Sequence, residues 1–132
     1  MPQKELPTSA ALAFLGDAVH TLYVRRLLVA QGLAKSGALN DAARPLVSAE
    51  GQAAQAARVL PQLTEHEHDV YRRAFNSGHL NRPKHASGAD YRAATGWEAV
   101  LGMLTYTEQH DRAEALLALA LAEEEKTNDS ED

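Results

Sequence analysis

The sequence contains no cysteine and no long apolar run, and each absence excludes a class of protein. Without cysteine there can be no disulfide, and nothing indicates an oxidising compartment. No run of about 18 apolar residues is present to span a membrane, and the N-terminal MPQKELPTSA lacks the apolar centre of a signal peptide. The sequence therefore predicts a cytoplasmic protein that makes no membrane contact.

One acidic segment accounts for the whole negative charge. The net charge is −5, and the last ten residues, EEEKTNDSED, hold six acids and one lysine. Residues 1–122 are therefore neutral, with 12 basic and 12 acidic side chains. The chain has the length of a single domain. We expect a folded domain over 1–122 and a disordered acidic tail over 123–132, because the tail has too few apolar side chains to fold.

A basic stretch lies within this neutral region. Residues 70–89 contain no acid and four Lys or Arg side chains, namely Arg72, Arg73, Arg82 and Lys84. A polyanion responds to local charge rather than to the total charge of the chain. The stretch is therefore either a contact for nucleic acid or a solvated basic loop.

Helical periodicity and capping residues predict an all-α fold. Thr8 can cap a helix over residues 9–30, and Gly32 is placed to end it. A short helix over 38–43 is expected to stop before Pro45, because the residue before proline disfavours helical geometry. The remaining helices are expected over 49–60 after a Ser48 cap, over 65–76 after a Thr64–Glu67 capping box, over 90–106 and over 111–125, with a loop over 77–89.

Two acids stand in the middle of otherwise apolar helices, Asp17 in FLGDAV and Glu98 in GWEAVLG. A buried lone charge is costly unless it is paired or binds a cation. Each acid is expected on a face of small residues, with bulky core residues opposite. If the two small faces meet, the acids form a half-built Mg²⁺ site; if they do not, each is a solvated surface charge. The expected core residues are Leu12, Leu15, Val19 and Leu22 opposite Asp17, and Trp97, Leu101 and Leu104 opposite Glu98.

Five segments, in their order and spacing, resemble the ribonuclease III catalytic-domain family. They are FLGDAV, LYVRRLL, VSAEGQAAQA, RRAFNSG and YRAATGWEAVLG, and the resemblance covers roughly residues 8–120. The chain is most similar to the compact bacterial form, Mini-ribonuclease III, which lacks a double-stranded-RNA-binding domain. We expect no such domain here, since the 132 residues leave no room for one.

The resemblance implies a homodimeric endoribonuclease that cleaves double-stranded RNA and leaves 5′-phosphate and 3′-hydroxyl ends. It also implies a role in maturing the large-subunit (23S) ribosomal RNA precursor during ribosome biogenesis. Asp17 and Glu98 match the family's catalytic, metal-binding acids, with Mg²⁺ as the cofactor or Mn²⁺ in its place. Larger family members have two more acids, where this chain has Ala13 and Thr95. Substrate phosphate and water would then complete the metal shell.

Without a separate RNA-binding domain, basic side chains of the catalytic domain are expected to grip the duplex, mostly through its shape and phosphates. Phe14 is expected either to be buried within the subunit or to contact the dimer partner. His20 is expected to pack or to form hydrogen bonds rather than to catalyse. The expected RNA contacts are Arg72, Arg73, Arg82, Lys84, His85 and Arg92.

Two other functions stay open at this point. A non-catalytic RNA-binding protein would keep the fold, since two of the family's four acids are absent. A His-Asp metal-dependent phosphohydrolase would use His68 and Asp69, with His66 three residues from the aspartate on one helix face. No second histidine pair in the sequence completes a site of that kind.

Overall fold

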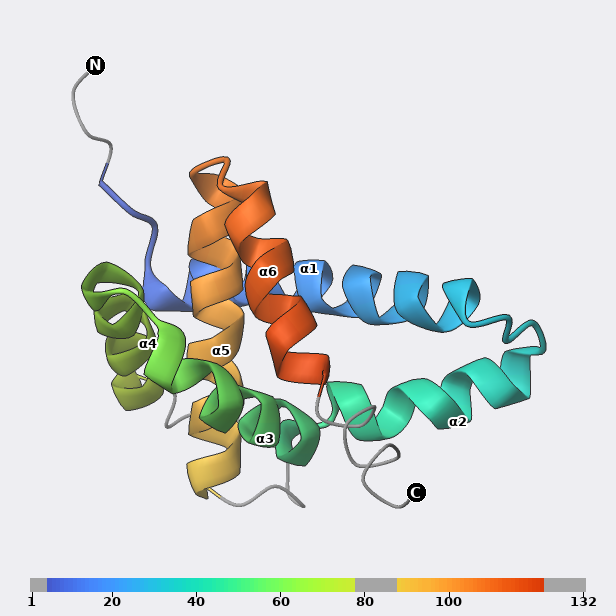
Figure 1. The fold of residues 1–132 in the computed structure, drawn as a ribbon. Coiled ribbons are helices and arrows are strands. Elements are labelled where there is room, and N and C mark those ends of the chain that lie inside the picture. Colours follow the sequence, from blue (N-terminus) through green and yellow to red (C-terminus); the bar gives the residue numbers. More distant parts are fainter. Residues whose placement is uncertain (1–4, 78–87, 123–132) are drawn as a thin grey trace.

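The computed structural model describes residues 5–77 and 88–122, and within them the fold is entirely helical, as predicted (Figure 1). The predicted loop over 77–89 and the acidic tail over 123–132 fall largely or wholly outside the described residues. The helices are α1 (Ser9–Ala30), α2 (Ser36–Val47), α3 (Ala49–Val59), the short 3-10 helix η1 (Leu60–Gln62), α4 (Glu65–Ser77), α5 (Gly88–Tyr106) and α6 (His110–Leu121).

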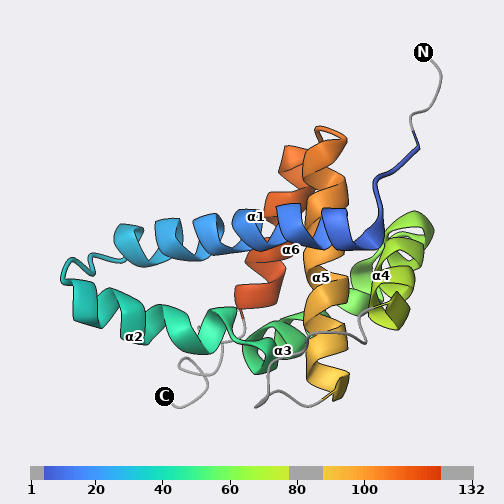
Figure 2. The same cartoon turned by 180° about the vertical axis from the view of Figure 1, so that it is seen from behind.

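Helix α5 forms the centre of the molecule. Helices α1, α3, α4 and α6 all pack against it, and α1 crosses it (Figures 1 and 2). The C-terminal half of α1 continues past this body and pairs with α2 as a hairpin. Trp97, Leu101 and Leu104 of α5 are completely buried, as predicted. The core therefore surrounds the helix that carries Glu98.

The crossing of α1 and α5 is a direct contact between backbones. A Cβ atom on Gly16 would lie 1.6 Å from the backbone oxygen of Glu98, and one on Gly102 would lie 1.9 Å from that of Leu12. No side chain larger than hydrogen fits at either position, so these glycines let the helices touch. The predicted meeting of the two small-residue faces is confirmed.

The predicted core stripe of α1 is mostly wrong, and this contact gives the reason. Because α1 meets α5 through its small residues, the bulky residues opposite turn outward: Leu15 and Val19 are half-buried, and Leu22 is 61% exposed. Only Leu12 of the predicted stripe is buried. The buried residues of α1 are Leu12, Ala13, Gly16, His20, Val24 and Leu28.

The side-chain caps of α1, α3 and α4 agree with prediction. Thr8 accepts a hydrogen bond from the N–H of Ala11, and Ser48 accepts one from that of Gly51. In the capping box, the backbone N–H of Thr64 donates to Glu67 Oε1 at 2.9 Å, and the N–H of Glu67 donates to Thr64 Oγ1 at 3.1 Å.

The predicted end of the second helix before Pro45 is wrong, since α2 runs on to Val47 with the proline inside it. Proline has no N–H to donate within the helix, but a later bond, from the N–H of Ser48 to the carbonyl of Arg44, continues the helix past it. Side chains of α3 then bond the last carbonyls, those of Leu46 and Val47.

In the described residues, no helix is both long and apolar enough to cross a membrane.

Candidate functional site

The α1–α5 crossing brings Asp17 and Glu98 together. Asp17 follows Gly16, the residue that packs on the Glu98 backbone, and the two carboxyl groups lie within hydrogen-bonding range. Asp17 is exposed, whereas Glu98 is partly buried beneath it. Burial raises the pKa of the Glu98 carboxyl to about 8, and the charge of Asp17 acts in the same direction. The site is therefore short of positive charge.

Gln52 is the third polar side chain of this site. It is 3% exposed, and its Nε2 atom donates to Glu98 Oε2 at 3.1 Å and to the carbonyl of Val47 at 3.0 Å. The bond to Glu98 favours the ionised carboxylate and opposes the effect of burial on its pKa. The Oε1 atom of Gln52 is buried and has no hydrogen-bond partner among the residues that the structure describes. Sequence reasoning missed this residue, because it lies 46 positions from its partner.

Behind the acids, a second glutamine joins α1, α3 and α5. Gln55 Oε1 lies 2.6 Å from His20 Nε2 and accepts a hydrogen bond from Trp97 Nε1 at 3.1 Å, while its Nε2 donates to the carbonyl of Leu46. His20 is completely buried, and this burial lowers its pKa, so the ring is neutral with its proton on Nε2. The interpretation of His20 as a packing and hydrogen-bonding residue is confirmed.

The donor atoms of this site fit a hard divalent cation. Two adjacent carboxylates repel each other, and a cation between them would relieve that repulsion. Ala13 is buried and Thr95 Oγ1 bonds to the carbonyl of Tyr91, so neither replaces the acid that larger relatives have there. Magnesium needs few protein ligands, because it keeps several waters.

The alternative His-Asp site does not assemble. Among the described residues, no three His, Asp or Glu side chains lie close enough together to hold a metal ion. Asp69 instead pairs with two arginines of its own helix, Arg72 and Arg73. His66 and His68 are exposed on the first turn of α4. The two histidines of this segment are therefore solvated side chains at the N-terminus of a helix.

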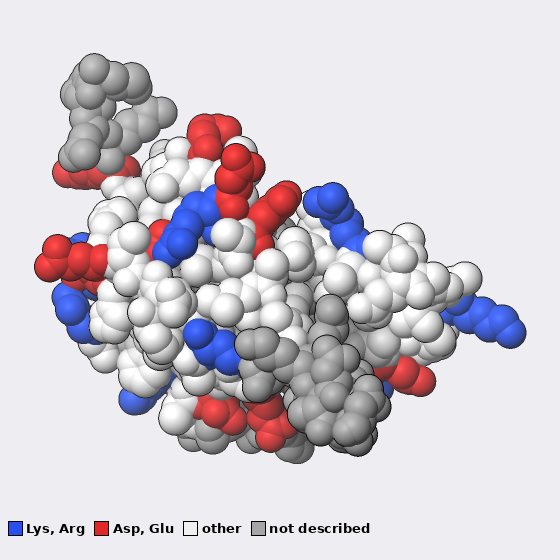
Figure 3. Space-filling model, viewed as in Figure 1, with Lys and Arg blue, Asp and Glu red and all other residues white. Residues whose placement is uncertain are grey.

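The predicted RNA contacts have different outcomes. Arg72 and Arg73 are exposed on α4, where both pair with Asp69, and Arg92 is exposed near the start of α5. On the face drawn in Figure 3, Lys and Arg side chains are interspersed with Asp and Glu rather than gathered. Three other predicted contacts, Arg82, Lys84 and His85, lie outside the described residues.

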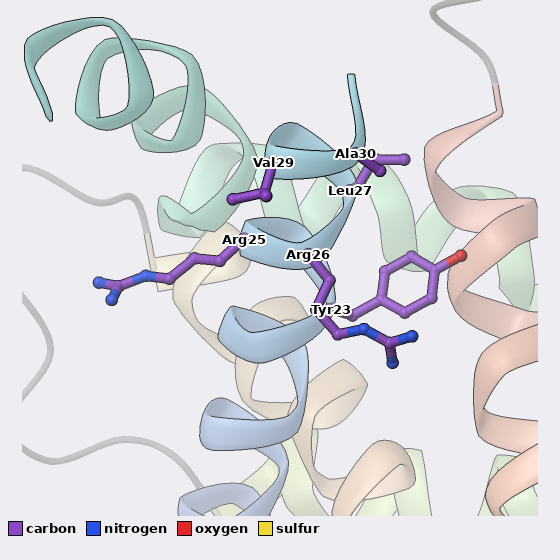
Figure 4. Close-up of a pocket in the computed structure, with 6 residues that line it drawn as sticks. All are labelled: Tyr23, Arg25, Arg26, Leu27, Val29 and Ala30. Carbon is purple, nitrogen blue, oxygen red and sulfur yellow. The ribbon is translucent and has the colours of Figure 1, made fainter. Parts of the chain in front are cut away.

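Phe14 is 84% exposed, so the alternative that it is buried within the subunit is wrong. Leu22 and Val29, each 61% exposed, follow it along the same side of α1. At the C-terminal end of this helix is a hollow of about 580 Å³ (Figure 4), from which Val29 and Arg25 extend to one side and Tyr23 to the other. Helix α1 therefore presents an apolar face to solvent along much of its length.

Comparison with known proteins identifies a family. The ribonuclease III domain matches residues 10–109. The Mini-ribonuclease 3 of Streptococcus pneumoniae is 42% identical over 110 residues, which are 82% of this chain and 86% of that protein. That of Enterococcus faecalis is 37% identical over 121 residues, covering 90% and 92% of the two chains. A crystal structure of a Fusobacterium nucleatum protein has the same fold, with a TM-score of 0.80 at 24% identity, over 89% of this chain and 93% of that one.

Proposed function

The chain belongs to the ribonuclease III domain family and is an endoribonuclease, and from this premise we propose that it cleaves double-stranded RNA with a divalent cation held by Asp17 and Glu98. Mg²⁺ is the proposed ion, with Mn²⁺ in its place where available. The observation that carries this proposal is the contact between the two carboxyl groups at the α1–α5 crossing.

Each side chain of the site has a separate task in this mechanism. A bound cation would neutralise charge on the scissile phosphate and activate water. Exposed Asp17 faces the side from which substrate arrives, whereas Glu98 is held from behind by Gln52. Because the protein offers only two acids here, substrate phosphate and water would supply the other ligands of a bound magnesium ion. Hydrolysis on this pattern leaves a 5′-phosphate and a 3′-hydroxyl.

Two copies of the chain are needed to cut both strands of a duplex at one place. A two-fold dimer supplies two centres and buries the same surface of each subunit. The exposed apolar face of α1, with Phe14, Leu22 and Val29, is the proposed contact. Light scattering should give a mass of about 28 kDa, twice the 14.3 kDa of the chain. Phe14→Glu should shift the protein toward monomer at low micromolar concentration, because it buries an unpaired charge. An unchanged dimer would place the contact elsewhere.

The proposed substrate is the large-subunit (23S) ribosomal RNA precursor in the cytoplasm. Contacts to the duplex are proposed for Arg92 of α5 and Arg72 and Arg73 of α4, which are exposed. The proposed set is completed by Arg82, Lys84 and His85. Phosphate contacts of this kind release counterions, so binding should weaken steeply with added salt.

The cleavage test uses long double-stranded RNA with Mg²⁺ or with EDTA. We expect fragments only with Mg²⁺, and none from Asp17→Asn in either condition. Glu114→Gln is the matched control, because it removes an exposed acid of α6 outside the site. A mobility shift of the RNA without any cleavage would instead favour a non-catalytic RNA-binding protein.

A further inference from the structure

We propose that Gln52 is a positioning residue of the metal centre: it holds the Glu98 carboxylate in the orientation that binds the cation. This inference rests on the proposed function, since it concerns a metal held by Asp17 and Glu98. It adds a residue from a third helix, α3, to the two acids of α1 and α5. Its effect on the reaction passes through Glu98 alone.

The position of Gln52 is determined by a rigid junction between α2 and α3. Ser48 caps α3 through its side chain, which places Gln52 in the first turn of that helix. Gly51 lies so close to α2 that a Cβ atom there would be 1.9 Å from the backbone oxygen of Pro45. The Nε2 atom of Gln52 is tied to the Val47 carbonyl at 3.0 Å. The side chain therefore approaches Glu98 from an anchored base.

The chemistry of an amide suits this task. Nε2 has two hydrogens, and one bonds to Val47 while the other bonds to Glu98 Oε2. The Glu98 carboxylate is thereby held at one oxygen and keeps the other for a ligand. Lysine or arginine at this position would also hold the carboxylate, but its charge would repel a cation. A neutral donor directs the acid without competing for it.

Two buried glutamines of α3 distinguish positioning from structural support. Gln55, one turn beyond Gln52, also donates to a carbonyl of α2, and its Oε1 has both His20 and Trp97 as partners. Within residues 5–77 and 88–122 the Oε1 of Gln52 has no partner, although the residue is only 3% exposed. A buried polar atom without a partner lowers stability. Gln52 thus costs the fold some stability that Gln55 does not, and of its two hydrogen bonds one anchors it to Val47 and the other reaches Glu98.

The test compares Gln52→Met with Gln55→Met. Methionine has nearly the shape of glutamine but cannot donate to a carboxylate. We expect Gln52→Met to bind Mn²⁺ at least about 10-fold more weakly, followed by the free-ion signal in electron paramagnetic resonance. Its melting temperature should stay within about 4 °C of wild type, because an unpartnered amide oxygen is lost with the hydrogen bonds. Gln55→Met should show the opposite pattern, with wild-type Mn²⁺ affinity and a lower melting temperature.

Cleavage assays give a second readout. In Gln52→Met, the Mg²⁺ concentration for half-maximal cleavage should rise about 10-fold or more, while kcat at saturating Mg²⁺ falls much less. A purely structural role would lower the active fraction and leave the half-saturating concentration unchanged. If the methionine variant does not fold, Gln52→Asn carries the same test, because it keeps the amide but withdraws it by one methylene.

Wild type and Asp17→Asn separate the failure of this inference from failure of the proposed function. If wild type binds no Mn²⁺, or Asp17→Asn binds as tightly as wild type, the metal site itself is wrong. If Asp17→Asn loses binding and Gln52→Met keeps wild-type affinity, the site stands and the role of Gln52 is overturned.

Discussion

Two glutamates of this protein, Glu67 in the core and Glu98 partly buried, have opposite surroundings. Glu67, at the start of α4, is 4% exposed and meets Arg112 of α6 in a two-pronged ion pair, with both N···O distances 2.9 Å. The backbone of Thr64 adds a further hydrogen bond. The hydrogen bonds from Arg112 are the main reason that the pKa of Glu67 is lowered despite its burial. Each oxygen of this acid has a partner, so its role is structural.

Glu98, by contrast, has Gln52 as its one hydrogen-bond donor among the described residues, and another acid as its neighbour. Burial and the nearby Asp17 together raise its pKa to about 8. A site that serves only stability would not keep two acids together without a cation. The difference between Glu67 and Glu98 shows that burial alone does not identify a functional acid. What marks Glu98 is the absence, among the described residues, of the positive charge that Glu67 has.

Cleavage should show the largest difference between the two glutamates. Glu98→Gln keeps the shape of the side chain and removes the charge that holds the cation, so cleavage should fall at least about 1,000-fold. Asp17→Asn should lower cleavage by a similar factor, for the same reason. Glu67→Gln should leave cleavage at 25 °C nearly unchanged, because it lies outside the site. Initial rates on one duplex at fixed Mg²⁺ check this, and a fully active Glu98→Gln would sink the assignment.

Stability should show the reverse order. Glu67→Gln removes a charge-assisted pair and leaves Arg112 without its ion-pair partner, so the free energy of unfolding should fall by about 2 kcal/mol. Metal-free Glu98→Gln at pH 8 should be at least as stable as wild type, because it removes a repelled charge. Urea unfolding in EDTA measures both. Equal losses of unfolding free energy in the two variants would contradict a structural role for Glu67 alone.

Much of this arrangement could be predicted from local sequence signals. Capping residues act within three or four positions, so the starts at Thr8, Ser48 and Thr64 were predictable. The meeting of Asp17 and Glu98 was predictable from the small residues beside each acid and from the family resemblance. Both kinds of signal lie within one helix or one motif.

Other features depend on contacts that no local pattern specifies. Gln52 and Arg112 act on residues 46 and 45 positions away, and nothing in their neighbourhood in sequence indicates the partner. The exposure of Leu22 was missed, and that of Phe14 was left open, for a different reason. An apolar stripe predicts that a helix face is covered, but not whether its own subunit or another chain covers it.

The pH dependence of stability should also differ between the two acids. The folded-state pKa of Glu98 lies near 8, above the unfolded value of 4.5. Its contribution to the free energy of unfolding is therefore fully present below pH 4.5 and is lost as pH rises toward 8. The lowered pKa of Glu67 has the opposite sign: its contribution is present above pH 4.5 and is lost on acidification.

Metal-free wild type should therefore lose stability between pH 5 and pH 8 relative to Glu98→Gln, by about 3 kcal/mol. Urea unfolding of both proteins in EDTA across this range provides the measurement. Glu67→Gln serves as the control, since it keeps Glu98 and should show the wild-type trend in this range. Parallel curves for wild type and Glu98→Gln would contradict the raised pKa.

Proton release on metal binding should give the smallest effect and the most specific one. At pH 7 a carboxyl with a pKa of about 8 is mostly protonated, and a cation binds only its ionised form. Binding of Mg²⁺ should therefore release about one proton per chain at pH 7 and much less at pH 9.5. Titration calorimetry in two buffers with different ionisation enthalpies counts these protons. Glu67→Gln should release as many as wild type, because Glu67 is already ionised beside Arg112. Release that does not change with pH would show that Glu98 is ionised before the metal arrives, and the contrast with Glu67 would then be one of position alone.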